Sequence, residues 1–260
     1  AWNSILSDFS LGKPVHRLIC GDVGFGKTEI AIRASFVVCL NHKQVVVLAP
    51  TTILCKQLYD CFMDRLKSFG IAVAQMSRIS KNNNKTALEF VDKKIDIIVG
   101  THSVLKNKKV LSQASLFILD EEHRFGVEQK ESFLSSSPGC HYISMSATPI
   151  PRTLQLSLSG IRNVSTLLSP PKSRKPIITN VYNYNESLLK QIVLNEINRG
   201  GQVYFVDNSV NNIVFFKSFL EKSFPSFSIE TLFGSLSPAD INKAMFQFKS
   251  GKIDILVSTT

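Results

Sequence analysis

The chain has 260 residues, of which 44% are hydrophobic and 19% charged, a composition that excludes a disordered or fibrous protein. Lysine and arginine outnumber aspartate and glutamate by 30 to 20, and the resulting formal charge of +10 favours a polyanionic partner. No apolar run reaches the roughly 18 residues of a membrane helix, and no signal peptide is visible. With five cysteines and no C-x-x-C pair, the sequence predicts a cytoplasmic protein with no membrane partner.

Short apolar runs alternate with helical patterns along the first two thirds of the chain. The predicted helices include 28–40 and 52–69, and the predicted strands are 17–21, 44–49, 72–77, 95–100, 116–120 and 142–146. This alternation predicts βαβ units around a parallel sheet. Because runs such as Val45-Val46-Val47-Leu48 are apolar throughout, we expect helices on both faces of the sheet.

A segment rich in proline and basic residues, 169–176, interrupts the alternation and predicts an exposed linker. The pattern then resumes with predicted strands 177–181, 202–206, 228–232 and 253–257, and predicted helices 187–198, 211–222 and 238–248. The sequence therefore predicts two α/β domains, 1–168 and 169–260. We expect the second to be incomplete, because no helix follows its last strand.

A phosphate-binding pattern, G-x-x-x-x-G-K-[ST], lies between the first predicted strand and the first predicted helix. It comprises Gly21, Asp22, Val23, Gly24, Phe25, Gly26, Lys27 and Thr28. Glycines let the backbone wrap a phosphate, and the helix N-terminus adds positive potential. Lys27 would neutralise the β- and γ-phosphates, and the Thr28 hydroxyl would bind Mg²⁺. The motif thus predicts a nucleotide site rather than a chance glycine turn.

Adjacent carboxylates follow the strand predicted at 116–120. Alone, a cluster such as Asp120-Glu121-Glu122 is more often a solvated helix start. Paired with the P-loop, it suits a Walker B site. Asp120 would hold Mg²⁺ through water, and Glu121 would polarise the attacking water molecule.

The segment after the strand predicted at 142–146 contains Ser146, Ala147, Thr148 and Arg152. By composition it is a proline-stiffened loop, for which a plain turn is the simpler interpretation. Parallel strands end at one edge of a sheet, where α/β proteins place their ligands. We therefore expect this loop, the P-loop and the carboxylate loop to converge on one rim.

Together these motifs resemble those of superfamily 2 helicases and translocases. The correspondence includes the P-loop as motif I, 50–52 as motif Ia, 100–102 as motif Ib, 120–123 as motif II and 146–148 as motif III. The strings D-E-E-H-R-F-G-V from Asp120 and A-T-P-I-P-R-T-L from Ala147 are typical of the RecG-like branch. The resemblance covers nearly the whole chain, from Lys13 to Thr260.

Four details are closer to the transcription-repair coupling factors of that branch than to its RecG helicases. They are Thr28-Glu29 after the P-loop lysine, Pro-Thr-Thr in motif Ia, Asp-Glu-Glu-His in motif II, and the passage 160–174 between the lobes. The resemblance implies an α/β fold with two RecA-like P-loop NTPase lobes, the second incomplete. It also implies an ATP-dependent translocase on double-stranded DNA that displaces stalled RNA polymerase and recruits the excision-repair protein.

Carried over residue by residue, the resemblance assigns catalysis to Lys27, Asp120 and Glu121. ATP would lie on the P-loop, with Mg²⁺ held by Thr28 and Asp120. The residues implied to couple nucleotide state to DNA contact are His123, Ser146, Ala147 and Thr148. The residues implied to face DNA are Thr51, Thr52, Gln57, Thr101, His102 and Arg152, although a polar residue at a strand end is often only a helix cap.

The sequence also departs from the family pattern. Phe233-Gly234-Ser235-Leu236 stands where His-Gly-x-Met is usual, which puts a DNA or interlobe contact there in doubt. The sequence stops at the start of motif V, before the motif VI arginine fingers, which are worth on the order of 10³–10⁵ in rate. The segments that bind polymerase and the repair protein are also outside it. We expect this chain alone to bind ATP weakly and to be weakly active or inactive as an ATP hydrolase.

Two alternatives stay open. A RecG-like helicase would respond more to branched DNA than to linear duplex and would not displace a stalled polymerase. A non-hydrolysing DNA- or protein-binding remnant would fit the missing motif VI, whereas the intact P-loop and carboxylates argue against it.

The basic residues are concentrated in the first part of the chain. Residues 1–168 carry a net charge of +7, and residues 169–260 carry +3. Lys106, Lys108 and Lys109 follow motif Ib, and Lys81 and Lys85 precede it. If these lysines contact phosphates, DNA binding will fall steeply with salt. A solvated lysine face is the competing interpretation.

Overall fold

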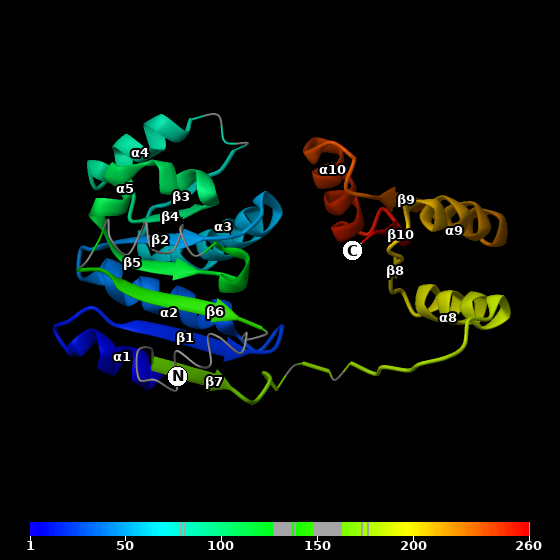
Figure 1. Ribbon diagram of the computed structural model, residues 1–260, viewed down its shortest axis with the longest axis horizontal. Coiled ribbons are helices and arrows are strands. Elements are labelled where there is room, and N and C mark those ends of the chain that lie inside the picture. The colour runs from blue at the N-terminus through cyan, green and yellow to red at the C-terminus, as the bar shows by residue number, and fades with distance from the viewer. Residues whose placement is uncertain are drawn as a thin grey trace. The chain divides into compact units, whose positions relative to one another are not determined.

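The computed structural model describes residues 1–78, 80, 82–126, 137, 139–147, 163–172, 174–175 and 177–259. The chain divides into two compact units, Ala1–Pro176 and Ile177–Thr260, which contain one parallel sheet each (Figure 1). The predicted α/β class with parallel sheets is confirmed. The predicted domain boundary between 168 and 169 stays a prediction.

The first unit is built on a seven-stranded parallel sheet in the order β3-β4-β2-β5-β6-β1-β7, which Figure 1 shows from top to bottom. Its strands are β1 (His16–Gly21), β2 (Gln44–Leu48), β3 (Val73–Met76), β4 (Ile97–Gly100), β5 (Ala114–Leu119), β6 (His141–Ser146) and β7 (Asn163–Leu167). Six of them lie where the apolar runs predicted strands. The seventh, β7, falls in the passage that the sequence placed between the lobes.

Helices cover both faces of this sheet, as the apolar strands predicted. The helices and 3₁₀ turns are α1 (Trp2–Ser10), α2 (Lys27–Leu40), α3 (Thr52–Leu66), η1 (Lys67–Phe69), α4 (Asn83–Val91), η2 (His102–Lys106), α5 (Lys108–Gln113) and η3 (Glu122–Arg124). Successive residues of a strand point to opposite faces. Accordingly, Val45 and Val47 of β2 pack with α2 and α3, whereas Val46 and Leu48 pack with α4 and α5.

A buried ion pair ties α1 to the β7 edge of the sheet. The Asp8 carboxylate accepts hydrogen bonds from the Arg17 guanidinium (Nη2 to Oδ1, 2.9 Å) and from Asn163 Nδ2 (3.3 Å). Arg17 Nη1 donates to Ser165 Oγ at 2.8 Å. Asp8 and Arg17 are 5% and 9% exposed, so removing either partner would leave a buried charge unpaired. These contacts join α1, β1 and β7, and they hold β7 beside the strand that leads into the P-loop.

The second unit contains a three-stranded parallel sheet in the order β8-β10-β9. Its elements are α8 (Glu186–Asn198), β8 (Val203–Val206), α9 (Val210–Ser223), β9 (Ile229–Leu232), α10 (Pro238–Lys249) and β10 (Ile255–Ser258). The strand predicted at 177–181 is wrong, because residues 177–185 form no helix or strand. Ile178 and Val181 are 84% and 93% exposed. Their apolar, β-branched composition favours a strand, but among the described residues no strand pairs with them.

No helix within the described ranges combines the length and apolar character needed to cross a membrane.

Candidate functional site

Three of the predicted motifs lie side by side at the carboxyl edge of the first sheet. The P-loop follows β1, motif II follows β5 and motif III follows β6, and β6 lies between β5 and β1 in the sheet. Cys20 of β1 pairs in register with Ser146 of β6. Burial raises the pKa of the Cys20 thiol, and the Glu122 carboxylate raises it further, whereas the Lys27 ammonium lowers it. The ends of the three strands that lead into these loops therefore lie side by side, whereas the motif III loop after Ala147 lies outside the described residues.

The P-loop owes its shape to two glycines in the left-handed region. Gly24 has a φ of 79° and Gly26 a φ of 90°, values that side chains with a Cβ rarely adopt. The Phe25 N–H donates to the carbonyl oxygen of Asp22 at 3.2 Å and closes the turn. Gly26 is the N-cap of α2. The free backbone N–H groups at the start of this helix give it the donor set of an anion site.

Lys27 lies in the mouth of this loop. Its side chain is folded back, and Nζ donates to the carbonyl oxygens of Gly21 (2.6 Å) and Asp22 (3.1 Å). Lys27 is only 9% exposed, and within the described part of the chain no carboxylate forms an ion pair with it. A buried ammonium held by neutral carbonyl groups suits a phosphate, because a charge-assisted hydrogen bond is stronger than a neutral one.

Asp120 follows β5 and faces the same loop. Burial and the neighbouring Glu121 carboxylate raise the pKa of Asp120 to about 6, against the Glu121 backbone hydrogen bond and the charge of Lys27. Burial and Glu121 thus disfavour the charged form of Asp120, and a bound cation would stabilise that form. Among the described residues no three His, Cys, Asp or Glu side chains gather as a metal cluster. The Asp120 carboxylate itself suits Mg²⁺, which binds few carboxylates and keeps several waters.

Glu121 adopts a strained backbone conformation. Its φ of 49° lies in the left-handed region, which is uncommon for a residue other than glycine. Its Oε2 lies 3.5 Å from His123 Nδ1 in the η3 turn. Such strain is concentrated at functional sites, where the surrounding structure holds it. Glu121 and His123, one predicted to be catalytic and the other to couple, are thus in direct contact.

The motif III residues are described in part. Ser146 is the last residue of β6, and its Oγ is buried without a hydrogen-bond partner among the described residues. Ala147 follows it. Thr148, predicted to couple, and Arg152, predicted to face DNA, lie outside the described residues. Ser146 thus ends the strand that lies beside β1, and its coupling role stays a prediction.

The residues predicted to face DNA after β2 serve partly as helix caps. Thr51 is the N-cap of α3, and its Oγ1 accepts a hydrogen bond from Leu54 N at 3.2 Å. Thr52 is the first residue of that helix, and Gln57 is exposed further along it. The capping contact supports the plain structural interpretation of Thr51.

The residues predicted to face DNA after β4 lie next to them, because β4 neighbours β2. Thr101 is buried, and its Oγ1 lies 3.2 Å from Ser103 Oγ. The His102 ring stacks on Phe125, with 4.7 Å between ring centroids. Motifs Ia and Ib therefore share the edge at which β1, β5 and β6 end.

Arg174 is a neighbour of the P-loop that sequence reasoning missed. Its Nη1 lies 3.8 Å from Asp22 Oδ2, and its Cζ lies 5.0 Å from the centroid of the Phe25 ring. A Cβ added to Gly24 would lie 3.4 Å from Arg174 Nε, so the side chain packs against the loop. The proline-rich composition of 169–176 predicted only an exposed linker. The available signal was a lone arginine in that segment, and it carries no spacing rule.

A parallel α/β sheet with a glycine-rich phosphate loop after β1 and carboxylates after β5 defines a P-loop α/β protein. Residues 1–157 match the DEAD/DEAH box helicase family, and residues 184–260 match the helicase conserved C-terminal domain. The chain belongs to the DEAD/DEAH box helicase family. Its α/β units are accordingly of the RecA-like helicase type.

Curated relatives carry the name transcription-repair-coupling factor. The chain is 41% identical to that of Rickettsia prowazekii (strain Madrid E), over 100% of this chain and 24% of the relative. It is 39% identical to that of Escherichia coli (strain K12), over 100% of this chain and 23% of the relative. The chain thus spans about a quarter of the length of the curated relatives it matches.

Solved structures are similar along the whole chain. RecG bound to a three-way DNA junction aligns with a TM-score of 0.79 and 30% identity, over 99% of this chain and 35% of that one. Saccharomyces cerevisiae Dbp5 bound to RNA and ADP BeF3 aligns with a TM-score of 0.70 and 19% identity, over 99% of this chain and 69% of that one. The second similarity shows the fold alone.

Proposed function

We propose that this chain is the ATP-driven motor part of a double-stranded DNA translocase of transcription-coupled repair. The observation that carries the proposal is the identity of 41% to a transcription-repair-coupling factor over the entire chain. The finer activity, displacement of stalled RNA polymerase and recruitment of the excision-repair protein, comes with that similarity. Residues 1–168 and 169–260 are the two lobes of the proposed motor.

ATP and Mg²⁺ are the proposed cofactors, and the P-loop geometry supports them. The backbone from Gly21 to Thr28 holds the phosphates, and Lys27 leaves its carbonyl partners to neutralise them. Thr28 and Asp120 hold Mg²⁺. When bound, ATP–Mg²⁺ supplies the phosphate bond whose cleavage drives movement. Glu121 accepts a hydrogen bond from the attacking water and orients it.

The proposed route from nucleotide to DNA runs along the carboxyl edge of the first sheet. Glu121 contacts His123. Ser146 ends β6, the strand beside β1, and Ala147 and Thr148 come next in the sequence. We assign coupling to four residues, namely His123, Ser146, Ala147 and Thr148. We assign contact with DNA to motifs Ia and Ib, the next loops along the edge, together with Gln57 and Arg152.

The test is a pair of assays on the protein that contains this chain. One measures ATP-dependent displacement of a triplex-forming strand from linear duplex DNA, and the other measures release of a stalled RNA polymerase. We expect both in the parent protein and neither in Lys27→Ala, because that variant loses the phosphate-neutralising charge. A parent protein that hydrolyses ATP but moves neither the strand nor the polymerase would contradict the proposal.

A RecG-like activity on branched DNA is the second candidate. The similarity to RecG bound to a three-way DNA junction favours it. The same protein separates the two candidates when three-way junctions and linear duplex are compared as stimulators of ATP hydrolysis. Stronger stimulation by the junction, together with failure to release the polymerase, would select the RecG-like activity.

A further inference from the structure

The chain returns to the P-loop after β7. Leu167, the last residue of β7, pairs in register with Gly21, the first residue of the P-loop motif. A Cβ added to Gly21 would lie 2.9 Å from Leu167 Cβ, so a larger residue at that position would push β7 away. Arg17 Nη1 also holds β7 through its hydrogen bond to Ser165 Oγ at 2.8 Å. The segment that follows Leu167 therefore starts at the rim of the P-loop.

The side chain of Arg174, in this segment, packs against the loop itself. Arg174 N donates to the carbonyl oxygen of Pro171 at 3.0 Å, which turns the backbone at this point. The guanidinium Cζ lies 5.0 Å from the centroid of the Phe25 ring. Arg174 Nε lies 3.4 Å from the position of a Cβ added to Gly24. Because Gly24 has no side chain, nothing at that position separates the guanidinium from the backbone of the loop.

The guanidinium of Arg174 has no hydrogen-bond acceptor among the described residues. The nearest carboxylate oxygen, Asp22 Oδ2, lies 3.8 Å from Nη1, which is beyond hydrogen-bond distance. Arg199, by contrast, donates from Nη2 to Glu196 Oε1 at 2.7 Å. The Arg174 side chain is only 25% exposed. An arginine that is largely buried and whose five N–H donors lack a protein acceptor suits an anionic ligand.

The place of Arg174 on the loop favours a phosphate as that anion. Asp22 is held by its own loop, since its Oδ1 accepts a hydrogen bond from Val23 N at 2.7 Å. Asp22 is also 65% exposed, so its attraction for Arg174 is screened by water. A polyphosphate carries more negative charge than one carboxylate, and its oxygens match the planar fork of a guanidinium. A phosphate bound on the loop would therefore compete successfully with Asp22 for Arg174.

We propose that Arg174 is a nucleotide-binding residue of the P-loop site, which exchanges Asp22 for the phosphates of bound ATP. The proposal deepens the proposed function and rests on it, since it presumes that the P-loop binds ATP. Lys27 is bonded to the carbonyl oxygens of Gly21 and Asp22, whereas Arg174 packs on Phe25 and Gly24. The site thus has two cations, supplied by parts of the chain that are far apart in the sequence.

A phosphate contact also has a consequence for the segment that carries Arg174. The second unit begins at Ile177, three residues further along the chain. A nucleotide that binds Arg174 would hold this segment to the first unit more firmly than the loose contact with Asp22 does. Arg174 is therefore a positioning residue for the segment as well as a ligand of the nucleotide.

The experiment measures Mg²⁺-dependent binding of a fluorescent, non-hydrolysable ATP analogue to the protein that contains this chain. A second titration displaces the analogue with magnesium tripolyphosphate, which carries phosphates but neither base nor ribose. The variants are R174Q, which removes the charge, and R174K, which keeps the charge without the planar fork. The matched control is K175Q, because Lys175 is an exposed cation next in the sequence. Thermal unfolding without nucleotide shows that each variant is folded.

We expect R174Q to bind the analogue at least about tenfold more weakly, because hydrogen bonds to charged groups are lost. Tripolyphosphate should lose affinity by the same factor, and R174K should fall between R174Q and the parent. K175Q should stay within about twofold of the parent, since an exposed charge is screened. Without nucleotide, R174Q should unfold within about 2 °C of the parent, because the contact with Asp22 is partly exposed.

Three results would overturn the assignment of Arg174 while leaving the proposed function standing. One is an R174Q variant that binds the analogue as tightly as the parent, or more tightly, as a residue that only covers the empty loop would give. Another is an equal loss in K175Q, which would reflect net charge alone. The third is a loss for the analogue but not for tripolyphosphate, which would place Arg174 at the base or the ribose. A parent protein that binds no analogue would overturn both the assignment and the proposed function.

Discussion

The two units share one structural frame and differ in the residues placed at its edge. β2, β3 and β4 pair in the order β3-β4-β2, and β9, β10 and β8 pair in the same order. The details repeat as well. Gln44 Nε2 donates to the carbonyl oxygens of Phe90 (2.5 Å) and Ile95 (2.8 Å), and Gln202 Nε2 donates to those of Phe248 (2.7 Å) and Ile253 (2.6 Å). Each glutamine thus ties a strand to the turn before the central strand.

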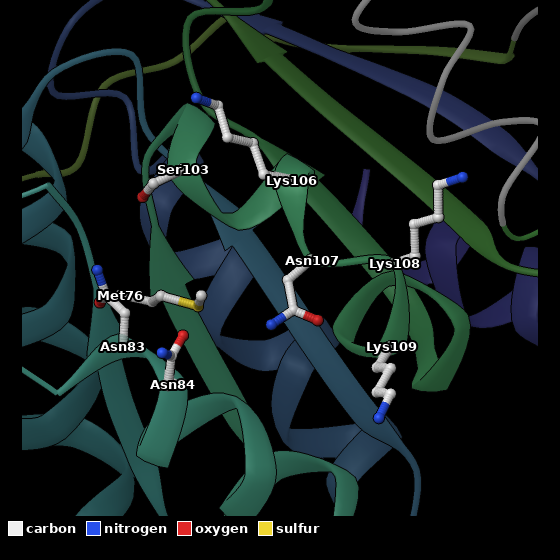
Figure 2. Close-up of a pocket in the computed structure, with 8 residues that line it drawn as sticks. All are labelled: Met76, Asn83, Asn84, Ser103, Lys106, Asn107, Lys108 and Lys109. Carbon is white, nitrogen blue, oxygen red and sulfur yellow. The ribbon is translucent and has the colours of Figure 1, made fainter.

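The chemistry at the corresponding carboxyl ends is different. In the first unit, a pocket lies at the corner beside β3 and β4 (Figure 2), and its lining residues are Met76, Asn83, Asn84, Ser103, Lys106, Asn107, Lys108 and Lys109. In the second, the corner beside β9 and β10 carries the cap of α10, where Ser237 Oγ donates to Asp240 Oδ2 at 2.6 Å. One corner is basic and the other contains a carboxylate. The two units thus share the arrangement of their strands, while the ligand that each could bind depends on the side chains at the carboxyl ends of those strands.

The largest expected effect on stability comes from replacing the glutamine that ties each sheet together, Gln44 in the first unit and Gln202 in the second. We expect Gln44→Met to destabilise the first unit by about 3 kcal/mol, because two buried carbonyl oxygens lose their donor. Gln202→Met should cost the second unit about 1 kcal/mol, since Gln202 is only half-buried and water can replace its hydrogen bonds. Native-state hydrogen exchange of β2–β4 and β8–β10 measures each unit separately.

Gln57→Met, on the exposed face of α3, is the control for the side-chain change. Equal losses in the two units, or no loss in either, would mean that the glutamines do not hold a common frame. Nucleotide binding should stay unchanged in all three variants at temperatures where they are folded.

A smaller effect on stability is expected from Asp120, at the carboxyl edge of the first sheet. Because the pKa of Asp120 is raised to about 6 in the folded protein, its ionisation opposes folding. The contribution of Asp120 to stability is present below about pH 4, the unfolded pKa, and is lost as the pH rises through about 6. Without nucleotide or Mg²⁺, Asp120→Asn should therefore be more stable than the parent by on the order of 2 kcal/mol at pH 8, with little difference at pH 4.

The measurement is the free energy of unfolding of the first unit, by urea titration or hydrogen exchange, across that pH range. Asp60→Asn, at an exposed ion pair, is the matched control and should show a difference below about 0.5 kcal/mol. A constant difference between parent and Asp120→Asn from pH 4 to 8 would contradict the raised pKa. Stability gained by removing a candidate catalytic carboxylate would fit the usual conflict between stability and activity.

Much of this arrangement could be predicted from local sequence. The P-loop is a contiguous pattern whose glycines are required by backbone conformation, and the parallel sheet follows from apolar runs alternating with helices. Elements fixed by distant contacts could not be predicted in this way. β7 pairs with β1 and is held by Asp8, more than 150 residues away in the sequence. Its own residues are partly exposed and carry no strand pattern.

The strand predicted at 177–181 shows the opposite error. Its residues favour a strand, but strand formation depends on a neighbouring strand as well as on local composition. Arg174 was missed for a similar reason, since its place against Phe25 and Asp22 depends on the path of the chain after β7. The lysines of the pocket were visible in the sequence, but the contribution of Asn83 and Asn84 was visible only in the fold.

The central claim is that the carboxyl edge of the first unit, at the P-loop, is a nucleotide site. The most direct measurement is Mg²⁺-dependent binding of a non-hydrolysable ATP analogue by calorimetry, in the parent protein and in Lys27→Ala, with Lys56→Ala as the control. We predict one P-loop site whose affinity falls at least about tenfold in Lys27→Ala and is unchanged in Lys56→Ala, because Lys27 donates charge-assisted hydrogen bonds to the phosphates. Equal affinity of Lys27→Ala and the parent for the analogue would contradict the account.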